Sequence, residues 1–468
     1  MQSMPLEKTA RFAKRSILLI VGNLIKLAVQ LAVIYIYSRQ LSLEDYGRYQ
    51  SVWLYINLFS VIGLFGLPSV MLSSSTIDIK RWMKVNRKLV MRFLLCLTAG
   101  PILWILLLQQ DLSLVERVLL CLLLLAQNLS ILSETLSIKQ EAEKRLLLVN
   151  IIYHTLYLFV HLWLIYIQTF NLSYLLYSLI GLLLMKALTL YRNDRMAGVG
   201  EGITYSTKLG KQWLYLGLYD TVAVLFKWMD KWIILLFISL NEFAIYFNGS
   251  YEIPVFMLLA GAIGNIVVVE LAKSRLVDSA VALPLFKRSS LFMSALMLPA
   301  FCFLLFFYKE LFLFVFSEKY AAALPVFFAS IFIVPVRVMN YTAALQVFYK
   351  NDIILKGALI DLALAISLAA VLYPLLGLPG IALAFVLSSY IQGGFYLFHT
   401  SRLLQVPLYR LHPFKKMALV FLMSLLLTWA CHLLVEDASG LYKLAAGLLS
   451  TTVLAGGFFL YFFKRKEI

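Results

Sequence analysis

Long apolar runs separated by short polar connections dominate the sequence. Counted at about 20 residues each, the length that crosses the hydrocarbon core of a bilayer, they predict about 14 transmembrane helices. The predicted spans cover residues 16–38, 49–73, 89–108, 115–137, 146–168, 171–191, 213–239, 243–270, 286–308, 319–345, 353–373, 379–400, 414–434 and 441–463. We therefore expect an all-α polytopic membrane protein. The first run is too long for a signal-peptide core, so we expect a retained helix.

The connections alternate in charge. The connections predicted on one side, together with both terminal segments, hold most of the 41 Lys and Arg residues. The opposite connections hold only Arg39, Arg48, Arg117, Lys309, Lys319 and Lys443. Basic residues concentrate on the cytoplasmic side of membrane proteins. This asymmetry predicts a multi-pass protein of the cytoplasmic (inner) membrane with its N- and C-termini in the cytoplasm.

Composition agrees with this assignment. The chain is 62% hydrophobic and 14% charged, with a mean hydropathy of +0.87. Its net charge of +17 is explained by the basic connections, so no nucleic-acid partner is expected. The four cysteines fall inside apolar runs without ligand or disulfide spacing, and the sequence contains no P-loop or nucleophile–base pair. We expect a transporter without enzymatic activity, cofactor or metal. It could couple transport to the movement of H⁺ or Na⁺.

The longest internal connection predicts the domain organisation. It runs over residues 193–212, is polar and contains glycine. The prediction is an N-terminal six-helix lobe (1–192), a cytoplasmic linker (193–212), a C-terminal six-helix lobe (213–401) and an extra helix pair (402–468).

A short internal repeat supports two lobes. Residues 45–49 after the first helix are similar to residues 242–246 after the seventh, an offset of 197 residues. The same offset aligns Asn23 with Asp220 and Gln30 with Lys227. Parallel repeats with the substrate site between the lobes are a known transporter design.

The seventh predicted helix, within residues 214–239, has the strongest functional signal. It carries Asp220, Lys227, Asp230 and Lys231. A charge at the centre of a spanning helix costs roughly 2.5 to 3.5 kcal/mol on insertion scales, so these four are expected to face protein or water. Helical spacing places Asp220, Lys227 and Lys231 on one stripe with Asp230 beside it. We interpret the stripe as a wall of a polar cavity; the alternative is a structural ion pair of Lys227 with Asp230.

Two other helices offer polar faces. Asn23, Lys26, Gln30 and Tyr37 share one face of the first helix, the expected partner wall. Gln50, Asn57 and Ser60 form a stripe on the second helix. Further along it, Gly63 and Gly66 would let another helix approach closely, and Pro68 is placed to bend it.

The remaining deep charges have candidate partners. Arg337 and Asp361 lie at equal distances from the loop between the tenth and eleventh helices, so we expect a structural ion pair. Glu252 is either a cavity residue or a partner of Lys231. The ionisable residues predicted near the middle of the membrane include equal numbers of cations and acids. The sequence therefore does not predict a cavity with a net positive charge.

Four further ionisable residues are weaker candidates. His154 and His161 share a face of the fifth helix, where packing histidines are the simpler interpretation. Lys186 and Glu134 lie near helix ends and could reach the interface.

Several short motifs carry a family resemblance. The segment at residues 39–47, with Arg39, Leu41, Glu44, Tyr46 and Gly47, resembles the polysaccharide flippases (O-antigen and exopolysaccharide type) of the multidrug, oligosaccharidyl-lipid and polysaccharide exporter superfamily. Further similar motifs are Phe65-Gly66-Leu67, Asp230-Lys231 followed by Tyr246, and residues 316–322 before the tenth helix. Ser317 stands where the family often has glycine. The resemblance covers nearly the whole chain.

The resemblance implies two six-helix lobes with an extra pair, and a function. It implies that a polyprenyl-diphosphate-linked oligosaccharide is moved to the outer leaflet by alternating access, for cell-surface polysaccharide synthesis. Lys26, Lys227 and Lys231 would then contact phosphate or sugar, and Asp220 and Asp230 would bind hydroxyls or a coupling ion. The expected partners are the bilayer, this lipid-linked oligosaccharide and other polysaccharide-assembly membrane proteins.

Two other functions stay open. A cation-coupled multidrug antiporter of the same superfamily would use Asp220 or Asp230 to exchange protons for an organic cation. A membrane-bound polysaccharide polymerase or ligase would be expected to have a large outward loop, and the outward loops predicted here are short.

Overall fold

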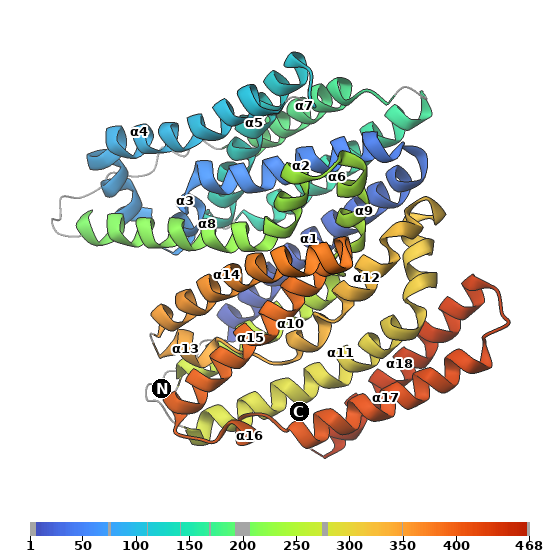
Figure 1. Ribbon diagram of the computed structural model, residues 1–468. Coiled ribbons are helices and arrows are strands. Elements are labelled where there is room, and N and C mark those ends of the chain that lie inside the picture. Colours follow the sequence, from blue (N-terminus) through green and yellow to red (C-terminus); the bar gives the residue numbers. More distant parts are fainter. Residues whose placement is uncertain are drawn as a thin grey trace. The chain divides into compact units, whose positions relative to one another are not determined.

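The protein is helical throughout its described part. The computed structural model describes residues 6–73, 76–109, 111–140, 142–167, 170–191, 206–273, 279–348 and 350–465, and no strand occurs among them (Figure 1). The predicted all-α class is confirmed. The predicted linker 193–212 lies outside the described residues up to position 205, and its last residues form the start of α8 (Ser206–Phe237).

Contacts divide the helices into two units, Met1–Asn241 and Glu242–Ile468. The first unit contains α1 to α8, and there α8 packs against α2, α3 and α4. The predicted lobe boundaries are a different division, drawn from connection length and the repeat, and they stay a prediction.

Every predicted span has a helical counterpart. In the described residues, ten helical segments are long and apolar enough to cross a membrane, and the bent pair α9 (Leu240–Gly249) and α10 (Pro254–Lys273) would make eleven. The other three predicted spans are α1, α2 and α8, of 35, 22 and 32 residues. These are the helices predicted to carry the polar stripes. The protein is therefore a multi-pass membrane protein.

In the first unit, α2 and α5 contact most of the surrounding helices. The helices α1 and α6 pack together, as do α5 and α7, while α2 contacts α4, α5 and α8. Ser113 begins α5 with a capping box closed by Glu116, and Asn171 caps α7. The bounds are α1 (Leu6–Gln40), α2 (Leu43–Leu64), α3 (Leu67–Ser73), α4 (Thr76–Leu108), α5 (Leu114–Lys139), α6 (Glu143–Tyr166) and α7 (Leu172–Leu190).

In the second unit, α11 (Ser279–Phe316) is the largely buried central helix. It contacts α10, α12, α17 and α18, whereas the outer faces of α17 and α18 are exposed and apolar, as suits contact with lipid. The other elements are the 3₁₀ helices η1 (Glu318–Ala323) and η2 (Val334–Val338), with α12 (Leu324–Ile331), α13 (Ala343–Val347), α14 (Asn351–Leu376), α15 (Leu378–Leu404), α16 (Leu408–Leu411), α17 (Phe414–Leu434) and α18 (Gly440–Lys464).

The helix bounds confirm the register of the internal repeat. α1 ends at Gln40 and α2 begins at Leu43, while α8 ends at Phe237 and α9 begins at Leu240. Both junctions therefore keep the predicted offset of 197 residues. The aligned aromatic positions are buried in both copies: Tyr46 with Phe243, and Tyr49 with Tyr246.

Three predicted spans are interrupted. The second breaks after α2, where Phe65 and Gly66 have positive φ, and continues as α3. The eighth bends by 54° between α9 and α10, with Pro254 at the new start. The tenth consists of η1, α12 and η2, because Pro335 interrupts regular helix, and α13 follows. Hydropathy predicted these spans but not their breaks.

Candidate functional site

Helix α8 carries the predicted stripe, and its four charges differ in exposure. Lys227 is exposed, Asp220 is partly exposed, and Asp230 and Lys231 are buried. Their neighbours in the first unit come from α2, α3 and α4. The stripe therefore changes along the helix from an accessible part to a part enclosed by protein.

Asp220 is held by a residue that sequence reasoning missed. The Ser69 hydroxyl on α3 donates a hydrogen bond to Asp220 Oδ2 at 2.6 Å. A hydrogen bond to a carboxylate is shorter and stronger than one between neutral groups. Ser69 reaches α8 only because the predicted second span breaks and restarts as α3.

Two glycines bring α3 and α8 together. Gly66 has a φ of +68°, and a Cβ built on it would collide with the backbone nitrogen of Gly217 on α8. A Cβ on Gly217 would in turn collide with the Phe65 ring. The expectation that Gly66 permits close helix approach is thus confirmed. At Gly63, the neighbouring groups are the side chains of Asn128 and Thr98, from two other helices.

The two lysines of α8 lie close to one indole. Lys227 Nζ is 5.3 Å and Lys231 Nζ is 5.7 Å from the centroid of the Trp228 ring, within the range of cation–π attraction. Lys231 Nζ also donates to Asp230 Oδ2 at 3.0 Å. Asp230 therefore pairs with Lys231, a partner that the structural alternative did not include. Asp230 and Lys231 are buried together, which keeps the two side chains in contact.

An aromatic cluster closes around the end of the charged part of α8. The Trp232 ring lies 5.1 Å from that of Trp104, 5.5 Å from Tyr55 and 5.7 Å from Phe59. Tyr55 donates its hydroxyl proton to Gln109 Oε1 at 2.6 Å. Such packing fixes the rotation of α8, and with it the direction of the lysines one to five residues earlier.

The polar faces of α1 and α2 are only partly accessible. Lys26, Gln30 and Asn57 are exposed, while Tyr37, Gln50 and Ser60 are buried among helices. The side chain of Asn23 lies outside the described part. Helix α1 packs mainly on α6, whereas α8 packs on α2, α3 and α4. That α1 forms the wall opposite α8 stays a prediction.

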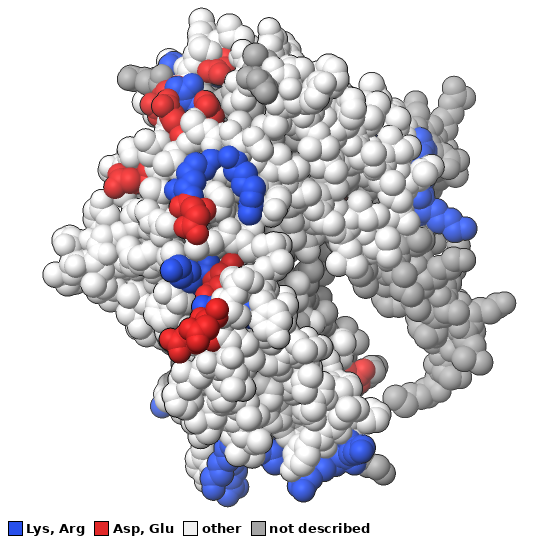
Figure 2. Space-filling view, turned by 90° about the vertical axis from the view of Figure 1, so that its right-hand side faces the viewer, with Lys and Arg blue, Asp and Glu red and all other residues white. Residues whose placement is uncertain are grey.

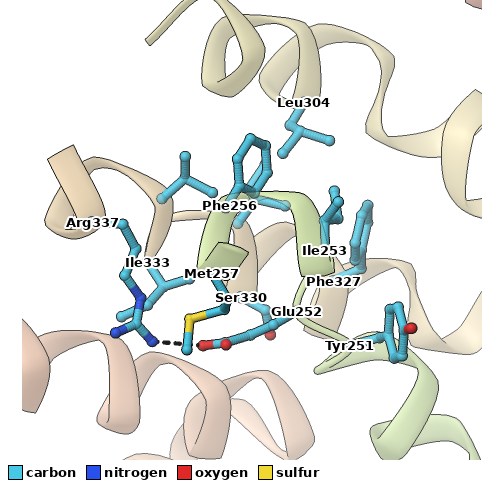
Figure 3. A pocket seen from close by; sticks show the side chains of 12 residues that line it. Tyr251, Glu252, Ile253, Phe256, Met257, Leu304, Phe327, Ser330, Ile333 and Arg337 are labelled. Atoms are coloured by element: carbon cyan, nitrogen blue, oxygen red, sulfur yellow. Dashed lines mark hydrogen bonds and ion pairs between the residues drawn. The ribbon is translucent and has the colours of Figure 1, made fainter. Parts of the chain in front are cut away.

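A second polar group lies in the break between α9 and α10. Glu252 Oε1 accepts a hydrogen bond from Arg337 at 2.9 Å, and both residues line a pocket whose other lining is mostly apolar (Figure 3). Figure 3 shows Met257 beside the pair, with Phe256, Phe327 and Leu304 among the other lining residues. Glu252 thus binds Arg337 and not Lys231.

The pairing of Arg337 also corrects its expected partnership with Asp361. The expected pair assumed two regular helices joined by one loop, but Arg337 lies in η2, and α13 separates η2 from α14. Asp361 is fully buried on α14. Its carboxylate lies near the Ser388 hydroxyl of α15, but neither oxygen makes a hydrogen bond of standard geometry within the described residues. A buried polar group without a partner is costly, so Asp361 calls for an explanation.

A buried pair also forms in the first unit. Lys186 Nζ lies 2.7 Å from Glu134 Oε1 and 4.5 Å from the centroid of the Tyr153 ring. Lys186 is 5% exposed, so its side chain is enclosed by protein. This corrects the expectation that it reaches the membrane interface. Nδ1 of His154 and of His161 each lies 2.7 Å from the carbonyl oxygen four residues earlier, which supports their interpretation as packing residues.

Comparison with known proteins gives similarity in structure only. No family model matches the sequence, and no curated protein sequence is significantly similar to it. Among solved structures, the lipid II flippase MurJ in an inward closed conformation matches with a TM-score of 0.64 at 13% identity, covering 96% of this chain and 100% of that one.

Transporters of the multidrug, oligosaccharidyl-lipid and polysaccharide exporter (MOP) superfamily match over less of this chain. An outward-facing multidrug resistance MATE transporter matches with a TM-score of 0.58 at 14% identity, covering 85% of this chain and 97% of its own. A MOP superfamily transporter from Pyrococcus furiosus matches with a TM-score of 0.57 at 14% identity, covering 84% of this chain and 95% of its own. The chain therefore shares its fold with these transporter structures.

Proposed function

We propose that this protein is a flippase that moves a polyprenyl-diphosphate-linked oligosaccharide across the cytoplasmic membrane by alternating access, for cell-surface polysaccharide synthesis. The observation that carries the proposal is α8, which keeps four ionisable side chains among apolar helices. Charges at such positions usually mark a substrate or ion pathway. A diphosphate is a suitable ligand for ammonium groups, and the Trp228 indole beside both lysines offers a flat apolar face.

The contacts assign different roles to the cations. Lys231 already neutralises Asp230 at 3.0 Å and is buried, so binding phosphate would require it to exchange partners. Lys227 is exposed, with its Nζ 5.3 Å from the centroid of the Trp228 ring, and we assign it the phosphate contact. Lys26 would be a second cation on α1. Asn23, Gln30 and Asn57 would bind sugar hydroxyls. Asp220 would also bind them, through carboxylate lone pairs that Ser69 does not occupy.

Fold similarity favours the flippase over the antiporter. The match to a lipid II flippase covers 96% of the chain, whereas the two MATE conformations cover 82% and 85%. The difference is about the share of the chain that α17 and α18 occupy. The terminal helix pair thus agrees with the flippase interpretation, and the positive charge of alternate connections supports cytoplasmic termini in the inner membrane.

Asp361 is our candidate for the residue that binds a coupling cation. It is a buried carboxylate without a hydrogen bond of standard geometry in the described residues, and a proton or Na⁺ would neutralise it. Glu252 is the weaker candidate, since Arg337 already neutralises it. A multidrug antiporter would use the same carboxylate, and for this reason it remains the second candidate function.

The experiment is an accessibility assay in proteoliposomes. A polyprenyl-diphosphate oligosaccharide is placed in the inner leaflet, and its exposure to a membrane-impermeant sugar oxidant is followed with and without protein. We expect protein-dependent exposure that Lys227→Ala slows and Lys227→Arg retains. Movement of an organic cation against a proton gradient, with no exposure of the lipid, would instead establish the antiporter. Exposure at the protein-free rate with several cargo lipids, and no cation movement, would contradict both functions.

A further inference from the structure

An open basic groove lies between the first turns of α11 and the start of α17. It has a volume of about 490 Å³, and most of its lining comes from one face of α11, with Pro413 and Lys416 on the other side. The nine lining residues are Ser279, Ala280, Leu283, Pro284, Lys287, Arg288, Leu291, Pro413 and Lys416. All of them belong to the second unit.

The groove is cationic at its rim. Lys287, Arg288 and Lys416 are exposed, and no Asp or Glu is among the nine lining residues. Lys and Arg side chains gather along the lower edge of the molecule in Figure 2, where acidic side chains are few. All three cations lie in connections or helix ends that the sequence predicts on the cytoplasmic side, where the leaflet carries anionic lipid.

A contact between His412 and α11, which we call the His412 anchor, fixes the wall of the groove. His412, in the connection before α17, lies with Nδ1 2.6 Å from Ser290 Oγ and its ring 5.8 Å from that of Phe286. Ser290 and Phe286 both belong to α11, so this contact ties the start of α17 to α11. Burial lowers the pKa of His412 to about 4, so the imidazole is neutral at neutral pH and contributes no charge to the groove.

Apolar surface continues directly from the cations. Leu283 and Leu291 line the groove, and the face of α17 after Lys416 exposes Leu419, Met423 and Leu426, which are 56%, 42% and 61% exposed. A ligand with a phosphate at one end and hydrocarbon at the other fits this order of surfaces. A soluble anion would use only the rim.

We propose that this groove binds the phosphodiester headgroup of an anionic phospholipid, with an acyl chain along α17. Lys287, Arg288 and Lys416 contact the phosphate, and the His412 anchor positions the two helices that carry them. Its residues are different from those of the charged stripe of α8, and the proposal does not depend on which cargo the protein moves.

The test measures lipid binding, not transport. The full-length protein is purified in neutral detergent, and binding of dioleoylphosphatidylglycerol is titrated by native mass spectrometry against dioleoylphosphatidylcholine. The variants are Lys287→Gln/Arg288→Gln/Lys416→Gln and a matched triple, Lys84→Gln/Arg87→Gln/Lys88→Gln, which removes three exposed cations from α4. Inorganic phosphate and glycerophosphoglycerol are competing probes without acyl chains.

We expect one tightly held phosphatidylglycerol that the groove variant binds about a hundredfold more weakly, while the α4 variant binds it as wild type does. Equal weakening in both triples would mean a general charge effect and would overturn the assignment. Wild-type affinity in the groove variant would overturn it as well. If inorganic phosphate displaces the lipid at equal concentration, the groove is a soluble-anion site. His412→Asn, which keeps a partner for Ser290, is expected to weaken binding only a few-fold.

Discussion

The two copies of the repeated junction begin alike and then differ. In both, a long helix ends, two residues connect, and a second helix begins with buried aromatic residues at its fourth and seventh positions. The first copy continues for 22 residues as α2 before it breaks, whereas α9 ends after 10 residues. The local sequence therefore specifies the junction, and the packing that follows determines where each second helix stops.

The breaks that end these helices serve different contacts. The break after α2 is closed: Gly66 packs against Gly217, and Ser69 binds Asp220. The break after α9 borders a pocket and presents Glu252 to Arg337. One interruption attaches a helix to the charged stripe, and the other leaves room beside an ion pair.

The largest expected effect is at the glycine of the first break. Gly66→Ala combines a positive φ with a collision against backbone, so we expect a loss of about 4 kcal/mol in the free energy of unfolding. Gly249→Ala, at the end of α9, meets the Val326 side chain at 2.6 Å without a positive φ, so we expect about 2 kcal/mol. Unfolding in mixed micelles measures both.

Gly100→Ala is the control for these two substitutions. Gly100 is inside α4 with no atom within 4 Å of a built Cβ, so alanine is expected to stabilise the helix by up to about 1 kcal/mol. Equal costs at Gly66 and Gly249 would mean that the two breaks are held by the same kind of packing, contrary to the comparison.

The ion pairs of the two units should differ next most strongly. The side chains of Lys186 and Glu134 are 7% and 33% exposed, and those of Arg337 and Glu252 are 34% and 41% exposed. Removing Lys186 leaves a partly buried carboxylate without its cation and a space where the buried lysine stem was, so Lys186→Ala is expected to cost about 2 kcal/mol. A double-mutant cycle on Arg337→Ala and Glu252→Gln is expected to give a coupling of about 0.5 kcal/mol. A coupling as large as the Lys186 effect would show that the Glu252 break is as closed as the first.

The charged stripe is tested through transport. We expect Lys227→Ala and Asp230→Asn to slow exposure of the lipid-linked oligosaccharide by about tenfold, equivalent to about 1.4 kcal/mol, with normal membrane insertion. Lys84→Ala, on the exposed surface of α4, is the matched loss of one positive charge. Wild-type transport in both stripe variants would remove α8 from the translocation pathway.

A gain in stability, smaller than the losses at Gly66 and Gly249, is expected at Ser317, between α11 and η1. Ser317 has φ 75° and ψ 165°, a conformation that nearly always requires glycine, and its sequence context suggested glycine there. Ser317→Gly should stabilise the protein by about 1 kcal/mol, measured as a higher thermal midpoint. A lower midpoint would mean that the serine side chain makes a compensating contact.

The sequence predicted helices better than their interruptions. Hydropathy located all fourteen apolar segments, and the offset of 197 residues predicted both junctions. It did not locate the α9–α10 bend, because counting apolar runs gave no weight to Pro254, which starts the new helix. Pro68 suggested a bend in the second span, but the positive φ at Phe65 and Gly66 moved it earlier.

Partners of buried charges were the least predictable feature. Position along a helix gave the depth of Arg337, Asp361 and Glu252, but partner choice depends on the rotation of each helix and on the irregular η2 and α13 segments. The same limit hid Ser69, whose role needs a short helix that hydropathy merges with α2. Charge within an apolar run, as in α8, remained informative because its cost does not depend on rotation.

Helix α8 is continuous and is held at two places. Gly217 and Asp220 lie within one turn and contact Phe65 and Ser69, and Trp232 packs in the ring cluster with Tyr55, Phe59 and Trp104. Gly217 and Lys231 are about 21 Å apart at 1.5 Å per residue, so the two attachments hold both ends of the charged stripe. A helix held at both ends behaves as one rigid strut, so the spacing of its four charges would stay fixed if the surrounding helices moved.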